Sequence, residues 1–217
     1  MASVTNLPIS NIFNITATFG QSGSLWKNGH KGMDLTAPQK TIYSVCDGEV
    51  TVVGFDKNGW GRYVSIKPDG FERIRFILCH MVENSVKVKK GDRVNRLTKI
   101  GTMGTTGNST GVHLHIEMRI DNKSVNPSQY LLIPNERLQN LNSANYKFDA
   151  NCQKTALAAI LDAFDKNAAL PDISAICSVA SNGQTDRISA LEKELAAAKS
   201  EIAILKFKIN NAKSALQ

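Results

Sequence analysis

The sequence predicts a mainly β fold class, with antiparallel strands followed by an α-helical C-terminal region that ends in a coiled coil. Residues 1–130 hold short alternating or β-branched runs, residues 152–169 are rich in helix formers, and residues 186–217 carry a heptad pattern. With 217 residues, 42% of them hydrophobic, the chain is long enough to bury one full core and an appendage.

Strand signals recur at short, regular intervals through the first part of the chain. The turn pairs Asp47-Gly48, Asn58-Gly59 and Gly107-Asn108 are typical of the connections between such strands. This spacing favours an antiparallel sheet over βαβ units. The runs expected to form strands are Thr41–Val45, Glu49–Val53, Tyr63–Ile66, Arg73–Leu78 and His113–Ile120.

The character of the sequence changes after Pro134, so we expect the β-rich domain to cover residues 1–134. Residues 135–185 are predicted to be a helical linker region, with an amide-rich connector over 135–150 and an amphipathic helix over 152–169. That helix has an apolar stripe made by Leu157, Ile160, Leu161 and Phe164.

Residues 186–217 are predicted to be a coiled-coil oligomerisation segment, because apolar residues repeat there at alternating spacings of three and four. The expected partner is a second copy of the chain, as a homodimer or homotrimer. The alternative is a helical hairpin formed with residues 152–169. The heptad positions are Ile188, Leu191, Leu195, Ala198, Ile202, Leu205, Ile209, Ala212 and Leu216.

Charge and composition narrow the choice of partners. The formal net charge of +7 lies mostly in the first part of the chain, which suits an anionic partner or simply solubility. Nucleic acid is not expected, because basic and aromatic residues are not interleaved in a known pattern. No apolar run is long enough for a membrane span, and no signal peptide is evident. Four scattered cysteines do not suggest a disulfide framework, so we expect synthesis in a reducing cytoplasm.

Histidine is scarce, and all four copies lie in the β-rich part. His30 and Asp34 are separated by a glycine-containing loop or strand edge, and His113 and His115 share one face of a predicted strand with Glu117. Imidazole nitrogen and carboxylate oxygen are good Zn²⁺ ligands. The alternative for any single histidine is packing or surface placement. For Glu117 two interpretations are open: it orients a metal ligand, or it forms an ion pair with Arg119 or another base.

Several blocks of sequence occur in an order that resembles the lysostaphin-type zinc endopeptidases of bacterial cell walls. The resemblance runs from residue 18 to residue 131 and includes an HxGxD motif and an HLHxE motif. All four histidines fall on family positions. The matching blocks are HKGMDL (30–35), DGEV (47–50), GWGRYVSI (59–66), KKGDRV (89–94), IGTMGTTGNSTG (100–111) and HLHIE (113–117).

The resemblance implies a peptidase domain with an open groove, in which His30, Asp34 and His115 bind Zn²⁺ and leave a fourth position for water. His113 and His80 would be the catalytic residues beside that water, His113 as the general base and His80 as the stabiliser of the oxyanion, or with these roles exchanged. The family position of a tyrosine is occupied by Leu78, which puts fine specificity in doubt. Cys79 is expected in the core, on the strand face opposite to that of His80.

The implied function is zinc-dependent hydrolysis of peptide cross-links in peptidoglycan, whose peptide is the expected substrate. Two alternatives remain: a wall-binding or activator module without enzymatic activity, and a virion structural protein that carries a wall-degrading domain. Because no signal peptide is evident, we expect a protein made in the cytoplasm that acts on the cell wall through phage lysis or as part of a virion.

Overall fold

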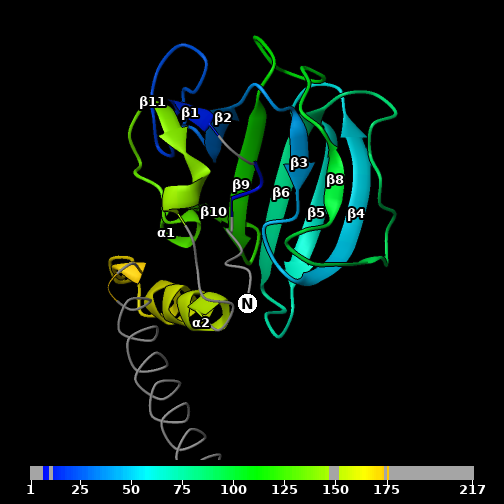
Figure 1. Ribbon diagram of the computed structural model, residues 1–217. Helices are drawn as coiled ribbons and strands as arrows, with labels where there is room; N and C mark the ends of the chain where they lie inside the picture. Colours follow the sequence, from blue (N-terminus) through cyan, green and yellow to red (C-terminus); the bar gives the residue numbers. More distant parts are fainter. Residues whose placement is uncertain (1–6, 10–11, 147–151, 174, 176–217) are drawn as a thin grey trace, which may run out of the picture. The chain divides into compact units, whose positions relative to one another are not determined.

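The computed structural model describes residues 7–9, 12–146, 152–173 and 175 (Figure 1). The predicted coiled coil and the end of the predicted linker region lie outside these residues. The chain divides into two units, residues 1–177 and 178–217, and the described residues all lie in the first. No described helix is long and apolar enough to cross a membrane.

A nine-stranded antiparallel sheet forms the first unit, with the strand order β11-β1-β2-β9-β6-β5-β4-β7 and with β10 paired to β9. A separate pair joins β3 and β8. The strands are β1 (Ile12–Ala17), β2 (Met33–Thr36), β3 (Thr41–Tyr43), β4 (Gly48–Asp56), β5 (Gly61–Pro68), β6 (Ile74–Met81), β7 (Arg93–Val94), β8 (Lys99–Thr102), β9 (Leu114–Ile120), β10 (Lys123–Val125) and β11 (Leu138–Asn142). The helical elements are α1 (Ser128–Leu131), a 3-10 turn η1 (Ser143–Asn145) and α2 (Cys152–Asp165). The predicted mainly β antiparallel class is confirmed.

Alternation of apolar and polar residues explains how the central strands sit in the sheet. In β9, Leu114, Ile116 and Met118 are fully buried in the hydrophobic core, as their shared strand face predicts. Val112 precedes the strand and is 42% exposed. The β4–β5 hairpin turns where Asn58-Gly59 predicted a turn.

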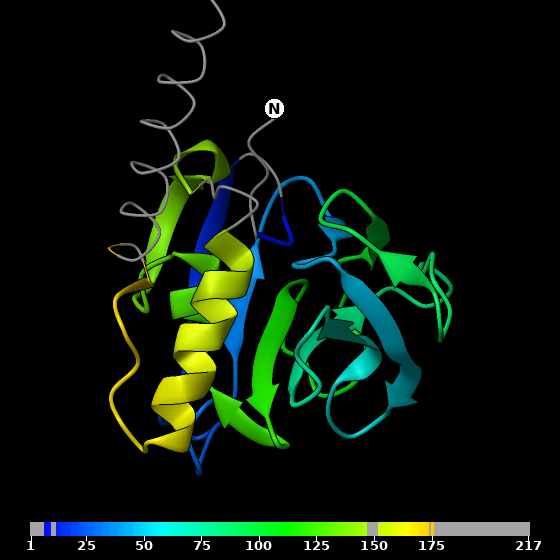
Figure 2. The same cartoon turned by 90° about the horizontal axis from the view of Figure 1, so that it is seen from below.

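Helix α2 packs on the sheet domain. Leu157 and Ile160 are buried in the same core as the strands, while Leu161 and Phe164 are half-buried against it. Figure 2 shows α2 in front of the part of the sheet that holds β1, β2 and β9. In addition, β11 pairs with β1 along residues expected to be a connector. The described part of the predicted linker region therefore belongs to the packed domain.

The burial of α2 can be tested through Ile160, which is fully buried. Replacing it with alanine is expected to lower the free energy of unfolding by about 2–5 kcal/mol, because a core cavity is left. Lys154→Ala, on the exposed side of α2, is the matched control. Denaturant unfolding measures both. Equal effects of the two substitutions would contradict the packing of α2.

The cysteines differ from expectation in one respect. Cys46 and Cys79 are free and buried. Cys152, at the start of α2, is disulfide-bonded. The sequence did not suggest a disulfide framework, and it did not predict the pairing of Cys152, because spacing alone does not reveal which thiols the fold brings together.

Candidate metal centre

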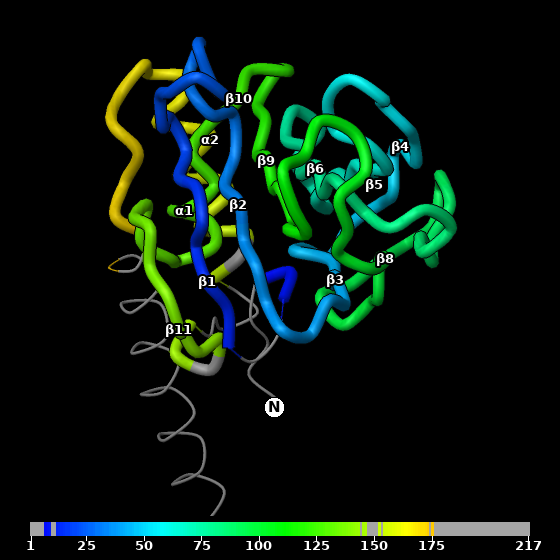
Figure 3. Tube along the Cα trace, turned by 90° about the horizontal axis from the view of Figure 1, so that it is seen from above, coloured from blue at the N-terminus to red at the C-terminus, as the bar shows by residue number. Residues whose placement is uncertain are grey.

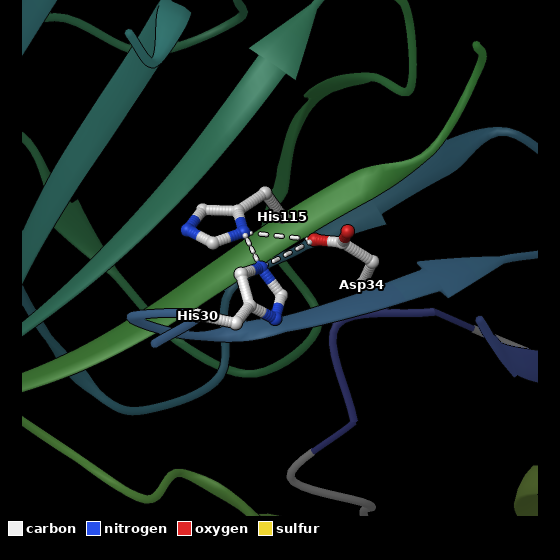
Figure 4. A group of neighbouring side chains, drawn as sticks. All are labelled: His30, Asp34 and His115. Atoms are coloured by element: carbon white, nitrogen blue, oxygen red, sulfur yellow. Dashed lines mark hydrogen bonds and ion pairs between the residues drawn. The ribbon is translucent and has the colours of Figure 1, made fainter. Parts of the chain in front are cut away.

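Three predicted metal ligands converge in the interior of the sheet. Asp34 in β2 lies directly opposite His115 in β9, and His30 lies in the loop just before β2. Asp34 Oδ1 is 2.8 Å from His115 Nδ1 and 3.2 Å from His30 Nε2, and the two nitrogens are 3.0 Å apart (Figure 4). All three residues are buried, so these atoms form a compact set of donors for one ion.

A glycine between the donors keeps the two strands close. A Cβ atom on Gly32 would lie 2.2 Å from the carbonyl oxygen of Ile116 and 2.9 Å from Cε1 of His115. No other residue fits without moving backbone. The glycine of the HxGxD pattern is thus required by close approach to β9.

Hydrogen bonds on the outer side of each imidazole decide which nitrogen faces the site. His30 Nδ1 lies 2.9 Å from the carbonyl oxygen of Thr18, to which it donates, so Nε2 presents its lone pair inward. His115 Nε2 lies 3.2 Å from Glu117 Oε1 and donates to it, which leaves Nδ1 for the site. Two nitrogens and a carboxylate oxygen therefore meet within hydrogen-bond distance of one another, where a proton or a metal ion stabilises them.

The protonation states of Asp34 and His115 also provide a positive charge at this cluster of donors. Burial raises the pKa of Asp34, but hydrogen bonds from His115 and His30 outweigh it and hold that pKa well below its usual range. Burial lowers the pKa of His115, but Asp34 and Glu117 outweigh it and raise the pKa to about 9. Without metal, a proton on His115 provides the positive charge, and a bound metal ion would replace that proton. The donor set fits Zn²⁺, for which such ligands are typical.

Glu117 holds His115 in position. Its Oε1 accepts hydrogen bonds from His115 and from Trp60 Nε1, at 2.8 Å for the latter, and its Oε2 accepts from Arg119 Nε at 2.6 Å. Burial raises the pKa of Glu117, but its partners, His115 first, lower it to about 2. The sequence left two interpretations of Glu117 open, and both contacts exist. Trp60 was not predicted, although it lies within the matching block GWGRYVSI.

The Glu117 contact predicts an effect on metal affinity. Glu117→Gln is expected to lower the affinity for Zn²⁺ by about 10–100-fold, because the carboxylate that orients a metal-binding histidine is lost. Competition with a chromophoric chelator measures the affinity. Glu83→Gln, an exposed carboxylate on another loop, is the control. An unchanged affinity would show that Glu117 only neutralises Arg119.

His80 and His113 lie beside the three donors. Their ring centroids are 4.7 Å apart, and His113 Nε2 is 3.6 Å from Asp34 Oδ1. His80 Nδ1 donates to the carbonyl oxygen of Thr106 at 2.8 Å, and His113 Nδ1 donates to that of Gly111 at 2.8 Å. In the neutral form, Nε2 of each ring therefore has a free lone pair and acts as a proton acceptor.

An unusual backbone conformation turns His80 out of the regular strand alternation. His80 has a φ of 60°, in the left-handed region, near the end of β6. Its neighbour Cys79 pairs with His115, so Cys79 lies on the face of the sheet that carries the site. The expected burial of Cys79 in the core is confirmed, but its expected position on the strand face opposite to the site is wrong. Leu78 lies in the hydrophobic core instead.

Burial of His80 predicts a pH effect on stability. Burial lowers the pKa of His80 from 6.5 to about 4, so the unfolded chain binds more protons than the folded chain between these values. The free energy of unfolding should therefore fall as the pH falls from 6.5 to 4. His80→Gln, compared with the unaltered protein by thermal unfolding in chelator, should show a smaller fall. An identical fall would contradict the lowered pKa.

The donors line a cleft with aromatic walls and a volume of about 190 Å³. Trp26 lies against His30, with ring centroids 4.6 Å apart, and Trp60 lines the cleft beside Glu117. Leu25, also in the lining, is 62% exposed. All five predicted site residues line this cleft together, namely His30, Asp34, His80, His113 and His115.

The fold and this site define a class of protein: an antiparallel β domain with three donors that could hold a metal ion, flanked by two imidazoles in an open cleft. Residues 28–127 match the sequence model of peptidase family M23, and the chain belongs to this lysostaphin-type family. The predicted resemblance is confirmed, and the family match contains all five site residues.

Related proteins match the same part of the chain. It is 38% identical over 100 residues to the DD-carboxypeptidase/endopeptidase Mpg of Neisseria meningitidis, covering 45% of this chain and 22% of that protein. It is 32% identical over 118 residues to the murein hydrolase activator NlpD of Escherichia coli, covering 54% of this chain and 29% of that protein. The chain thus spans about a quarter of these curated relatives.

A solved structure is also similar, that of a point mutant of the catalytic domain of the prophage-encoded M23 protein EnpA from Enterococcus faecalis. The identity is 30%, the match covers 54% of this chain and 91% of that chain, and the TM-score is 0.48.

Proposed function

We propose that this protein is a zinc-dependent endopeptidase that hydrolyses peptide cross-links of bacterial peptidoglycan. The observation that carries the proposal is the joint presence of a three-donor centre and two imidazoles with inward-facing Nε2 atoms in one cleft. Similarity to a DD-carboxypeptidase/endopeptidase supports the substrate class.

The chain's own residues supply the proton transfers. His30, Asp34 and His115 would hold Zn²⁺, which when bound would lower the pKa of water and polarise a carbonyl group. His113 Nε2 is placed to accept a proton from the attacking water and to return it to the departing amine. The carbonyl of Gly111 keeps Nδ1 of that ring protonated, so Nε2 is the atom that exchanges protons.

His80 is assigned a different task because burial lowers its pKa to about 4. A neutral His80 presents an acceptor at Nε2, which orients a water hydrogen. Donation from Nε2 to a developing oxyanion requires prior protonation of the ring. We therefore assign the general base to His113, and the oxyanion role to His80 only in its protonated form.

Purified peptidoglycan provides the direct test. The zinc-loaded protein is incubated with walls of different cross-link types, and the released fragments are identified by mass spectrometry. We expect new amino termini at one type of cross-link, loss of release with chelator, and recovery with added zinc. A zinc-loaded protein that releases nothing from any wall type would refute the proposal.

The second candidate is an activator or wall-binding module without enzymatic activity, which the similarity to a murein hydrolase activator favours. The two candidates differ in their dependence on His113. An activator would stimulate a separate hydrolase equally well after His113→Ala, whereas an endopeptidase would lose its own activity.

Assembly and place of action complete the proposal. The heptad pattern of residues 186–217 supports a homodimer or homotrimer, and sedimentation of the full chain would reveal a monomer if this is wrong. We propose that the protein acts on the cell wall in phage lysis or as a virion component with a wall-degrading domain. Wall lysis by intact virions, compared with virions carrying His113→Ala, tests the second setting.

A further inference from the structure

A second hollow adjoins the metal centre. It has a volume of about 790 Å³ and lies between the loop that joins β1 to β2 and the hairpin that joins β9 to β10. Figure 3 shows that loop beside β10. His30 and Lys31 line both this hollow and the cleft of the metal centre. A molecule held in the cleft can therefore extend into the hollow.

The lining of this hollow is positively charged. Lys27, Lys31, Arg119 and Lys123 contribute to it, and no aspartate or glutamate among the described residues does. Glu117 neutralises Arg119 from inside the domain. Within the described part of the chain, the three lysines form no ion pair with a carboxylate. Three cations thus face the hollow without counter-charges.

The contacts of these lysines do not remove their charge. Lys31 Nζ donates to the carbonyl oxygen of Asn28 at 2.6 Å, and Lys123 Nζ lies 6.0 Å from the ring centroid of Phe164. Both groups keep donors or charge available for an anion. A cleft lined by one sign of charge concentrates field lines and attracts ligands of the opposite sign.

Neutral donors add to the cationic ones. Ser22, Asn28, Asn122 and Ser124 also line the hollow, and their hydroxyl and amide groups donate hydrogen bonds. Several donors around one space suit a carboxylate, which has two oxygens and about four lone-pair directions to satisfy. The lining therefore suits an anion with oxygen acceptors.

We propose that this hollow binds a free carboxylate of the peptide substrate. The inference rests on the proposed function and deepens it: the substrate is an acidic peptide with its carboxylate near the scissile amide. A peptide residue extends about 3.3–3.6 Å, so a group that reaches the hollow from the cleft lies within a few residues of the bond that is cut. A carboxylate is the anion that a peptide carries at this range.

Matched substrates isolate the carboxylate. Soluble cross-linked muropeptides from a wall type that the protein cleaves are divided, and half are converted to carboxamides with carbodiimide and ammonia. We expect kcat/KM to be about tenfold higher for the carboxylate form at low ionic strength, and the difference to shrink with added salt. Soluble muropeptides exclude any contribution from anionic wall polymers.

Two double variants test the location. Lys27→Gln/Lys123→Gln removes two cations of the hollow and should bring the carboxylate-to-carboxamide ratio close to one. Lys89→Gln/Lys90→Gln removes two exposed lysines elsewhere and should leave the ratio as it is. Zinc content, measured for each protein, shows that the folded metal centre is retained.

The outcomes separate this inference from the proposed function. Equal cleavage of both forms by the unaltered protein overturns the carboxylate site and leaves the endopeptidase in place. A ratio that both double variants reduce equally also overturns it. If no wall type is cleaved, the endopeptidase is refuted, and calorimetry with the carboxylate and carboxamide forms of cross-linked muropeptides tests the hollow by itself. Tighter binding of the carboxylate form then supports the carboxylate site, and equal binding overturns it.

Discussion

Replacement of Asp34 with alanine is expected to lower the affinity for Zn²⁺ by more than about 100-fold. Removal of a mere supporting contact to a metal ligand costs about 10–100-fold, and Asp34 is itself one of the three donors. The substitution also leaves the nitrogens of His30 and His115 facing each other at 3.0 Å without the carboxylate. Chelator competition and metal analysis after dialysis measure the loss.

Asp162→Ala is the matched control, because Asp162 is an exposed carboxylate on α2 that pairs with Lys166. This control should bind zinc as the unaltered protein does. If Asp34→Ala kept the affinity within about threefold, the cluster of His30, Asp34 and His115 would not be the metal centre, since loss of a direct donor exceeds the effect of a supporting contact.

Replacement of His113 with alanine is expected to lower kcat on peptidoglycan by about 10²–10⁴-fold while zinc remains bound. His113 is outside the three-donor set but within reach of it, with Nε2 3.6 Å from Asp34 Oδ1. Loss of its lone pair removes the proton acceptor without removing a metal ligand. Release of soluble wall fragments and zinc content are measured on the same preparation.

Val112→Ala, next to it in the chain and 42% exposed, controls for disturbance of the segment before β9. We expect this control to keep both zinc and activity. If His113→Ala cleaved walls as fast as the control, the general base would be His80. If it lost zinc, His113 would be a metal ligand.

The central strands could be predicted because apolar residues alternate with polar residues along them or form β-branched runs. Strands β4, β5, β6 and β9 each contain a run that the sequence marked, and β5, β6 and β9 lie in the middle of the sheet with buried residues. The first strand, IFNITA, was missed although Phe13, Ile15 and Ala17 alternate with less buried residues as in a regular strand. The strand LQNLN was missed because two polar residues separate its two leucines. Both lie at one end of the sheet, where pairing with each other and with β2 supplies what the pattern does not show.

The members of the site could be predicted, but part of its geometry could not. Spacing placed His115 and Glu117 on one strand face, and both do lie in the site. The left-handed conformation of His80 could not be predicted, because side-chain alternation assumes a regular strand. The sequence therefore placed Cys79 on the wrong face of the sheet. Trp60 escaped prediction because its contact with Glu117 joins residues 57 positions apart.

The pairing of Asp34 with His115 has a consequence for how the protein acquires its metal. These two donors lie on β2 and β9, each of which is hydrogen-bonded to strands on both sides. We therefore expect the chain to complete its fold first and to load an ion afterwards, unlike small zinc domains, whose folding waits for the metal. Removal and return of the ion would then act as a reversible on–off control of a rigid scaffold.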